Sequence, residues 1–151
     1  MASAAEMLRR LKSVSKITTL REMVYEDIKA NEDILRDLKY DEYEQGDIFS
    51  NHTTQRYKWD WYGNEKYRMN PRAMGNVDLI YSGSFINSFK LNRPNKNAYL
   101  FGATDPKRNK IVGMFGIDIM GLNQQTFEDF QVVIIKPLFI KKLEEKLNAK
   151  V

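Results

Sequence analysis

Few side chains in this sequence have the type and spacing that catalysis requires. The single histidine, His52, has no paired acid or nucleophile pattern around it, so we expect it in a surface loop. Ser82 has no histidine near it in the sequence. The acidic run at residues 41–44 could hold a hard cation weakly, but a solvated helix end explains it better. We therefore predict a protein that is not an enzyme and has no catalytic, cofactor-binding or metal-binding residues.

Aromatic and basic side chains alternate between residues 56 and 72. The aromatic residues are Tyr57, Trp59, Trp61, Tyr62 and Tyr67, and the basic residues are Arg56, Lys58, Lys66, Arg68 and Arg72. Such rings can stack on the bases of a single-stranded nucleic acid while the cations follow its phosphates. The same residue types also anchor protein interfaces. Because no nucleic-acid-binding signature accompanies them, we favour an assembly interface and keep nucleic-acid binding as the alternative.

The composition indicates one ordinary domain made in a reducing compartment. The chain has 151 residues, of which 42% are hydrophobic and 12% aromatic, and it contains no cysteine. No apolar run is long enough to span a membrane, and no targeting segment is evident. We therefore predict a single domain over residues 1–151 that does not cross a membrane.

The net charge of +4 is unevenly distributed along the chain. Residues 20–44 hold nine acids and four bases, whereas residues 45–110 hold five acids and eleven bases. This division favours head-to-tail contact between identical subunits, because unlike patches attract. Two solvated faces of a monomer are the equally simple alternative.

Helical patterns lie at both ends of the chain. Ser3 and Glu6 have capping-box spacing, and a second such box at residues 19–22 precedes an apolar stripe that continues to residue 38. Gly46 marks the end of this helical region. Asn123 is placed to cap a C-terminal helix over residues 124–148. Pro137 should kink that helix or begin a new one, and a strand at 132–135 is the second choice.

The middle of the chain reads as a loop followed by strands. Periodicity fades over residues 45–76, which predicts a long extended loop. The strand candidates are residues 77–81, 86–91, 98–103 and 111–119. Residues 104–109 should form a hairpin turn, and glycines at 113, 116 and 121 should mark bulges. We predict an α+β fold, with a twisted antiparallel sheet over 77–120 flanked by N-terminal helices over 4–44 and the C-terminal helix.

The Ser82–Gly83 pair is a predicted structural turn. Gly83 can adopt a positive φ at little steric cost, and the Ser82 hydroxyl can bond nearby backbone. Val77, Leu79 and Tyr81 would then project to one side of a strand, so the turn would set which residues reach the core.

The order of these motifs resembles a family of small virion proteins. The resemblance rests on residues 43–50, 70–79, 81–89 and 115–123, followed by a final helix. It covers roughly residues 35–147 and is to the tail-completion and neck-ring proteins of tailed phages, particularly crAss-like phages. Ser82 stands where that family usually has threonine, and residues 120–123 depart from its Phe-Gly-Leu-Ser pattern.

This resemblance implies a structural, ring-forming subunit of the phage head–tail connector, neck or proximal tail. The implied partners are identical copies, the portal and neighbouring neck or tail ring proteins, with non-specific contact to passing DNA. The implied location is the virion, after synthesis in the cytoplasm of the bacterial host. Besides the nucleic-acid-binding alternative, an enzyme inhibitor or host-takeover protein remains open.

Overall fold

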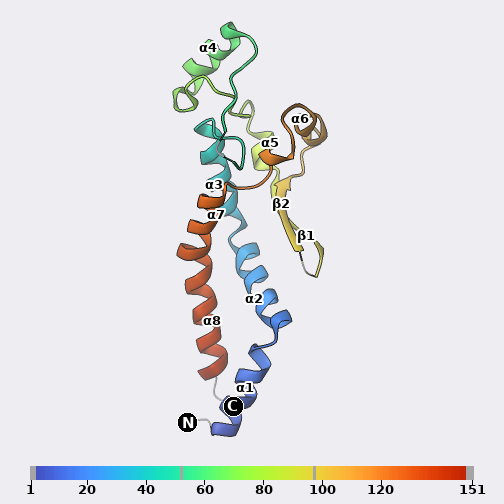
Figure 1. The fold of residues 1–151 in the computed structure, drawn as a ribbon, viewed down its shortest axis with the longest axis vertical. Helices are drawn as coiled ribbons and strands as arrows, with labels where there is room; N and C mark the ends of the chain where they lie inside the picture. Colours follow the sequence, from blue (N-terminus) through green and yellow to red (C-terminus); the bar gives the residue numbers. More distant parts are fainter. Residues whose placement is uncertain (1–2, 52, 97, 149–151) are drawn as a thin grey trace. The chain divides into compact units, whose positions relative to one another are not determined.

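The computed structural model describes residues 3–51, 53–96 and 98–148, so His52 lies outside the described residues. By its internal contacts the chain forms two compact units, one of residues 1–31 with 128–151 and one of residues 32–127. Helices and a two-stranded antiparallel sheet together confirm the predicted α+β class (Figure 1). We call these the terminal unit and the central unit and describe each by itself.

The terminal unit consists of packed helices. They are α1 (Ala4–Val14), α2 (Ile17–Ala30), the end of α7 (Gln124–Phe130), the π-helical turn η3 (Gln131–Ile135) and α8 (Lys136–Asn148). Helix α8 packs against both α1 and α2. The buried apolar side chains are Met23, Ile28, Phe130 and Ile135. As predicted, the Ser3 hydroxyl caps α1 by accepting from the backbone N–H of Glu6.

The long helix predicted from residue 20 is interrupted at Asn31. Helix α2 begins at Ile17 and ends at Ala30, and α3 (Glu32–Glu44) follows. Asn31 has φ −110° and ψ 24°, and its side-chain amide donates to the Asp27 carbonyl at 2.8 Å. Asparagine competes for helix carbonyls in this way, which explains why the helix is interrupted there although the apolar stripe continues.

The central unit contains the remaining elements. They are α3, α4 (Asp60–Met69), η1 (Pro71–Ala73), α5 (Ser84–Asn87), β1 (Phe89–Asn95), β2 (Ala98–Ala103), α6 (Arg108–Phe115), η2 (Ile117–Ile119) and the start of α7. Its core comprises Tyr43, Ile48, Val77, Phe85, Ile86, Phe89, Ala103, Ile119 and Met120. The rings of Tyr43, Phe85 and Phe89 lie within 5.6–6.4 Å of one another at its centre. In Figure 1, α4 and the β1–β2 hairpin lie at opposite ends of this unit.

Several predicted segments have a different structure. Residues 45–76 are not one extended loop, since they contain α4 and η1. Residues 111–119 are α6 and η2 rather than a strand, and 84–87 form α5, so the predicted strand at 86–91 begins only at Phe89. Short apolar runs with glycines suit either structure, and tertiary packing decided for helix here.

Residues 77–81 also form no strand. Leu79 has φ 53°, a left-handed conformation that interrupts the alternation a strand needs. Val77 is buried, but the Tyr81 side chain is 84% exposed, so the expectation that they project to one side of a strand was wrong. The predicted strand at 98–103 is confirmed as β2.

The hairpin lies between β1 and β2 and not at residues 104–109. Its register pairs Phe89 with Ala103 and Leu91 with Phe101. Residues 104–109 instead lead into α6, because the Asp105 carboxylate accepts from the backbone N–H of Lys107 at 2.7 Å.

Gly46 ends α3 in a position that requires glycine. Its φ is 76°, and a Cβ there would lie 3.0 Å from the carbonyl oxygen of Ala73. We expect Gly46→Ala to lower the free energy of unfolding by about 1–3 kcal/mol, through backbone strain and this clash. Urea denaturation followed by circular dichroism measures the change.

Gly113→Ala is the matched control. Gly113 lies within α6, and a Cβ there would meet no atom within 4 Å. The same substitution should therefore stabilise by about 0.5–1 kcal/mol through helix propensity. Equal effects of the two substitutions would contradict the role assigned to Gly46.

Candidate assembly interface

Helix α4 divides the five predicted interface aromatics into two groups. Trp59, Trp61 and Tyr67 are exposed, with 59%, 70% and 52% of their surfaces accessible. Tyr57 and Tyr62 are half-buried and meet edge to face, with ring centroids 4.9 Å apart. The three exposed rings are available to a partner, whereas Tyr57 and Tyr62 pack against each other within the protein.

Two methionines that the sequence analysis missed enlarge the exposed apolar surface. Met69 at the end of α4 is 63% exposed, and Met74 just after η1 is 70% exposed. Met74 has φ 54°, a conformation that non-glycine residues adopt rarely. We call Trp59, Trp61, Tyr67, Met69 and Met74 the α4 apolar surface. No motif marks such methionines, because a lone methionine in a polar stretch carries no pattern.

A buried ion pair holds α4 in place. The Nζ atom of Lys66 lies 2.9 Å from Oδ1 of Asp78 and also donates to the carbonyl of Ile80. Lys66 is 5% exposed and Asp78 is 1% exposed. The sequence pattern places Lys66 among the cations available to phosphates, but its burial excludes that role.

Three further donors complete the environment of the Asp78 carboxylate. The Tyr57 hydroxyl donates at 3.2 Å, the Asn70 side-chain amide at 3.1 Å, and the backbone N–H of Ile80 at 3.0 Å. Asn70 also donates to the carbonyl of Glu44 at the end of α3. A single carboxylate therefore joins both ends of α4 to the chain that follows it, which makes the α4 apolar surface a rigid platform.

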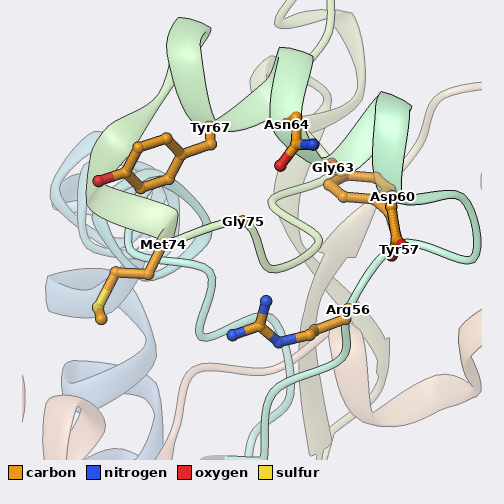
Figure 2. Close-up of a pocket in the computed structure, with 8 residues that line it drawn as sticks. All are labelled: Arg56, Tyr57, Asp60, Gly63, Asn64, Tyr67, Met74 and Gly75. Carbon is orange, nitrogen blue, oxygen red and sulfur yellow. The ribbon is translucent and has the colours of Figure 1, made fainter.

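An open cavity of about 450 Å³ lies beneath α4. Figure 2 shows the Arg56 side chain reaching into it, with Tyr67 and Asn64 on the helix and Met74 on the facing turn. Within the part of the chain that the structure describes, the Arg56 guanidinium forms no ion pair. The Arg56 side chain passes close to the backbone of Gly75: a Cβ atom added at that glycine would lie 3.9 Å from the Arg56 Nη1 atom. The cavity thus combines one cation, Arg56, and one carboxylate, Asp60, with aromatic and amide groups.

A second buried lysine organises the other side of the central unit. Lys39 donates to Glu42 at 3.1 Å and to the carbonyl of Gly121 at 2.6 Å. Glu42 in turn accepts from the backbone N–H of Asn123 at 3.0 Å, and the Asn123 side chain caps α7, as predicted. Burial lowers the pKa of Lys39, while the Glu42 charge opposes that shift. Part of the acidic run at 41–44 is therefore structural.

The Ser82–Gly83 turn leads into α5 and not from one strand to another. Gly83 has φ 79°, and the Ser82 hydroxyl accepts weakly from the backbone N–H of Ser84 at 3.4 Å. Phe85 and Ile86, which follow, are both buried. The turn therefore directs α5 into the core.

The acidic stretch at residues 20–44 is largely paired inside the chain. Lys142 lies 2.6 Å from Asp27, Arg36 bonds Glu32 and Asp33, and Arg72 bonds Asp41 and Glu44. Arg72 belongs to the basic stretch, so the two stretches neutralise each other in part within one chain. This internal pairing offsets part of the charge that the predicted head-to-tail attraction would use.

The comparisons with known proteins return no match: no protein-family model, curated protein or solved structure is similar to this chain. Within the described residues, no group of acidic residues is arranged to hold a metal ion. No helix among them is long and apolar enough to cross a membrane.

Removing Lys66 should be costly because it leaves the Asp78 carboxylate buried without its cation. We expect Lys66→Met to lower the free energy of unfolding by about 3–5 kcal/mol. The double variant Lys66→Met with Asp78→Asn should lose about 1–3 kcal/mol less than the sum of the two single variants. Urea denaturation of all four proteins measures this coupling, and strict additivity would show that the pair does not act as a unit.

The Tyr57 hydroxyl should make stability depend on alkaline pH. Burial, and then the Asp78 charge, raise the pKa of Tyr57 above its usual value of 10.0. The folded protein therefore keeps a proton that the unfolded chain releases, so this contribution is complete below about pH 10 and is lost above it. We expect the stability deficit of Tyr57→Phe relative to wild type to shrink between about pH 8 and about pH 11. A deficit that stays constant over this range, measured by urea denaturation, would contradict the assignment.

Proposed function

We propose that this protein is a non-enzymatic structural subunit that assembles into a ring of identical copies in the head–tail connector, neck or proximal tail of a tailed phage. The α4 apolar surface carries the proposal. Its five large apolar side chains are exposed on α4 and on residues that flank it, and the Lys66–Asp78 pair fixes that helix in place. The resemblance of the motif order to tail-completion and neck-ring proteins supplies the viral context.

The exposed apolar area of the α4 apolar surface is the physical reason for this proposal. Contiguous apolar patches on monomers are usually small, and larger ones mark interaction sites. Tryptophan and tyrosine dominate the energy of protein interfaces, particularly where they are held rigidly and lose little entropy on binding. Trp59, Trp61 and Tyr67 are residues of these types and are exposed. We therefore place the contact between neighbouring subunits on α4.

Charge attraction contributes less to the proposed association of subunits than the sequence predicts. The acids of α3 are mostly paired with Arg36, Lys39 and Arg72 of the same chain. Exposed ion pairs between subunits would add little in any case. Burial of the α4 apolar surface is therefore the main driving force in this proposal.

Trp59→Ala with Trp61→Ala should weaken assembly without unfolding the protein. Both side chains are exposed, so the free energy of unfolding should change by less than about 0.5 kcal/mol. The association constant between subunits should fall by at least about tenfold, since interface tryptophans often contribute over 1 kcal/mol each. Native mass spectrometry and light scattering of the purified protein, and its incorporation into phage particles, measure assembly.

The control replaces two other exposed apolar side chains of the central unit. Met114 and Ile117 are 65% and 59% exposed, and Met114→Ala with Ile117→Ala removes a comparable area away from α4. This variant should assemble like wild type. Normal assembly of the tryptophan variant would refute the role of α4, and absence of the polypeptide from purified particles would refute the virion assignment.

Single-strand nucleic-acid binding is the second candidate, and the cavity beneath α4 favours it. Arg56 and Tyr67 line that cavity together, and Lys58 lies 5.6 Å from the ring of the exposed Trp59. Filter binding of a thymidine oligonucleotide at several salt concentrations separates the candidates. Tight binding by the monomer with a steep salt dependence supports the nucleic-acid role. Burial of Lys66 and half-burial of Tyr57 leave fewer contacts for it, so we rank it second.

A further inference from the structure

The two edges of the β1–β2 hairpin differ in how their backbone groups are used. On the β1 edge, Arg36 donates to the carbonyl of Phe89 at 3.1 Å, and Glu32 accepts from the backbone N–H of Leu91 at 3.2 Å. Both side chains come from α3. The β1 edge is therefore covered by a helix that supplies the hydrogen bonds a further strand would make.

These bonds also fix which groups of β2 point outward. In an antiparallel ladder, alternate residue pairs direct their backbone groups away from the partner strand. Because Phe89 and Leu91 direct theirs to α3, their partners Ala103 and Phe101 must direct theirs away from β1. The backbone N–H of Ala103 indeed lies 3.5 Å from the sulfur of Met120, on the outer side.

The outer edge of β2 is open at Phe101. Among the described residues, no side chain or backbone group is hydrogen-bonded to the outward N–H and C=O of Phe101. Leu100 beside it is 62% exposed. No charged residue or proline, which native edges commonly use to discourage pairing, occurs in β2.

The hairpin and the start of α6 are basic in sequence. From residue 89 to residue 110 the chain carries Asp105 as its only acid, and six bases: Lys90, Arg93, Lys96, Lys107, Arg108 and Lys110. Self-pairing of two β2 edges would bring two such basic hairpins together, which like-charge repulsion opposes. All of the chain's acids except Asp47, Asp78 and Asp105 lie in helices, so another copy offers no acidic extended segment among the described residues.

We propose that the outer edge of β2 binds an acidic, extended segment of a different protein, which adds to the hairpin as a third strand. The backbone of Phe101 provides one donor and one acceptor for the added strand. The basic side chains of the hairpin and of the start of α6 select acidic residues in it. This site is separate from α4 and does not rest on the ring assembly proposed above.

Amide hydrogen exchange of the wild-type protein, followed by NMR, tests the proposal without any substitution. The probe is a capped peptide of about nine residues in which valine and glutamate alternate, the length of a long strand. In the free protein, the Phe101 amide should exchange faster than those of Leu100 and Gly102, which the ladder directs toward β1. The peptide should slow the Phe101 amide by at least about tenfold. Unchanged exchange at millimolar peptide would overturn the proposal.

Two further probes test the chemistry of the occupant. A peptide of the same length that alternates valine and lysine should give less than about a tenth of the protection. Equal protection would overturn the acidic preference. A thymidine oligonucleotide that protects Phe101 in place of the peptide would assign the edge to nucleic acid and overturn the proposal.

A matched pair of variants isolates the backbone donor. Phe101→Ala and Phe101→Pro both remove the ring that packs 5.3 Å from Phe89, but only proline also removes the N–H. Fluorescence anisotropy of the labelled glutamate peptide should show binding by the alanine variant and at least about tenfold weaker binding by the proline variant. Equal affinities would overturn the strand-addition geometry. The exchange experiment on wild type decides the matter if the proline variant does not fold.

Discussion

The carboxylate of Asp78 is the constraint on which the candidate interface depends. It is almost completely buried and receives Lys66 from α4, Tyr57 from the segment before that helix, and Asn70 from the residue after it. A charge in such a place is tolerated only when donors surround it, because its desolvation costs several kcal/mol. The arrangement specifies one position for α4 more than it adds stability. That position leaves the tryptophans facing outward.

A second buried lysine repeats this design on the other side of the same core. Lys39 joins Glu42 and the carbonyl of Gly121, and Lys66 joins Asp78 and the carbonyl of Ile80. In both cases a helical lysine reaches an irregular segment whose backbone carbonyl would otherwise lack a donor. The short helices and turns of the central unit bury little apolar area individually. The buried Lys39 and Lys66 contacts therefore fix the positions of irregular segments that regular secondary structure does not hold.

Local signals predicted the ends of elements better than their interiors. The Ser3 and Asn123 caps, the helix end near Gly46 and the strand at 98–103 depend on neighbouring residues, and all occur in the structure. Helix α4 escaped prediction because its exposed side mixes aromatic with polar residues and its buried side chain is Lys66, so no apolar stripe marks it. The irregular path at 77–81 escaped because the left-handed Leu79 follows from the Asp78 contacts, which are tertiary. The sequence therefore identified the candidate aromatic residues, but it did not identify Lys66 and Asp78 as the groups that position them.

The central unit leaves two surfaces of opposite character, and each has a structural cause. The α4 apolar surface arises because Asp78 draws Lys66 and Asn70 beneath the helix, which leaves Trp61, Tyr67 and Met69 exposed. The open edge of β2 arises because α3 uses Arg36 and Glu32 on β1, the other strand of the hairpin. An apolar platform suits broad contact with a rigid neighbour, whereas a strand edge suits a single extended chain. Since the two lie at opposite ends of the unit, one partner on α4 leaves the β2 edge accessible to another (Figure 1). Such a subunit can join a continuous assembly and still carry a separate protein, which is the arrangement that a connecting component requires.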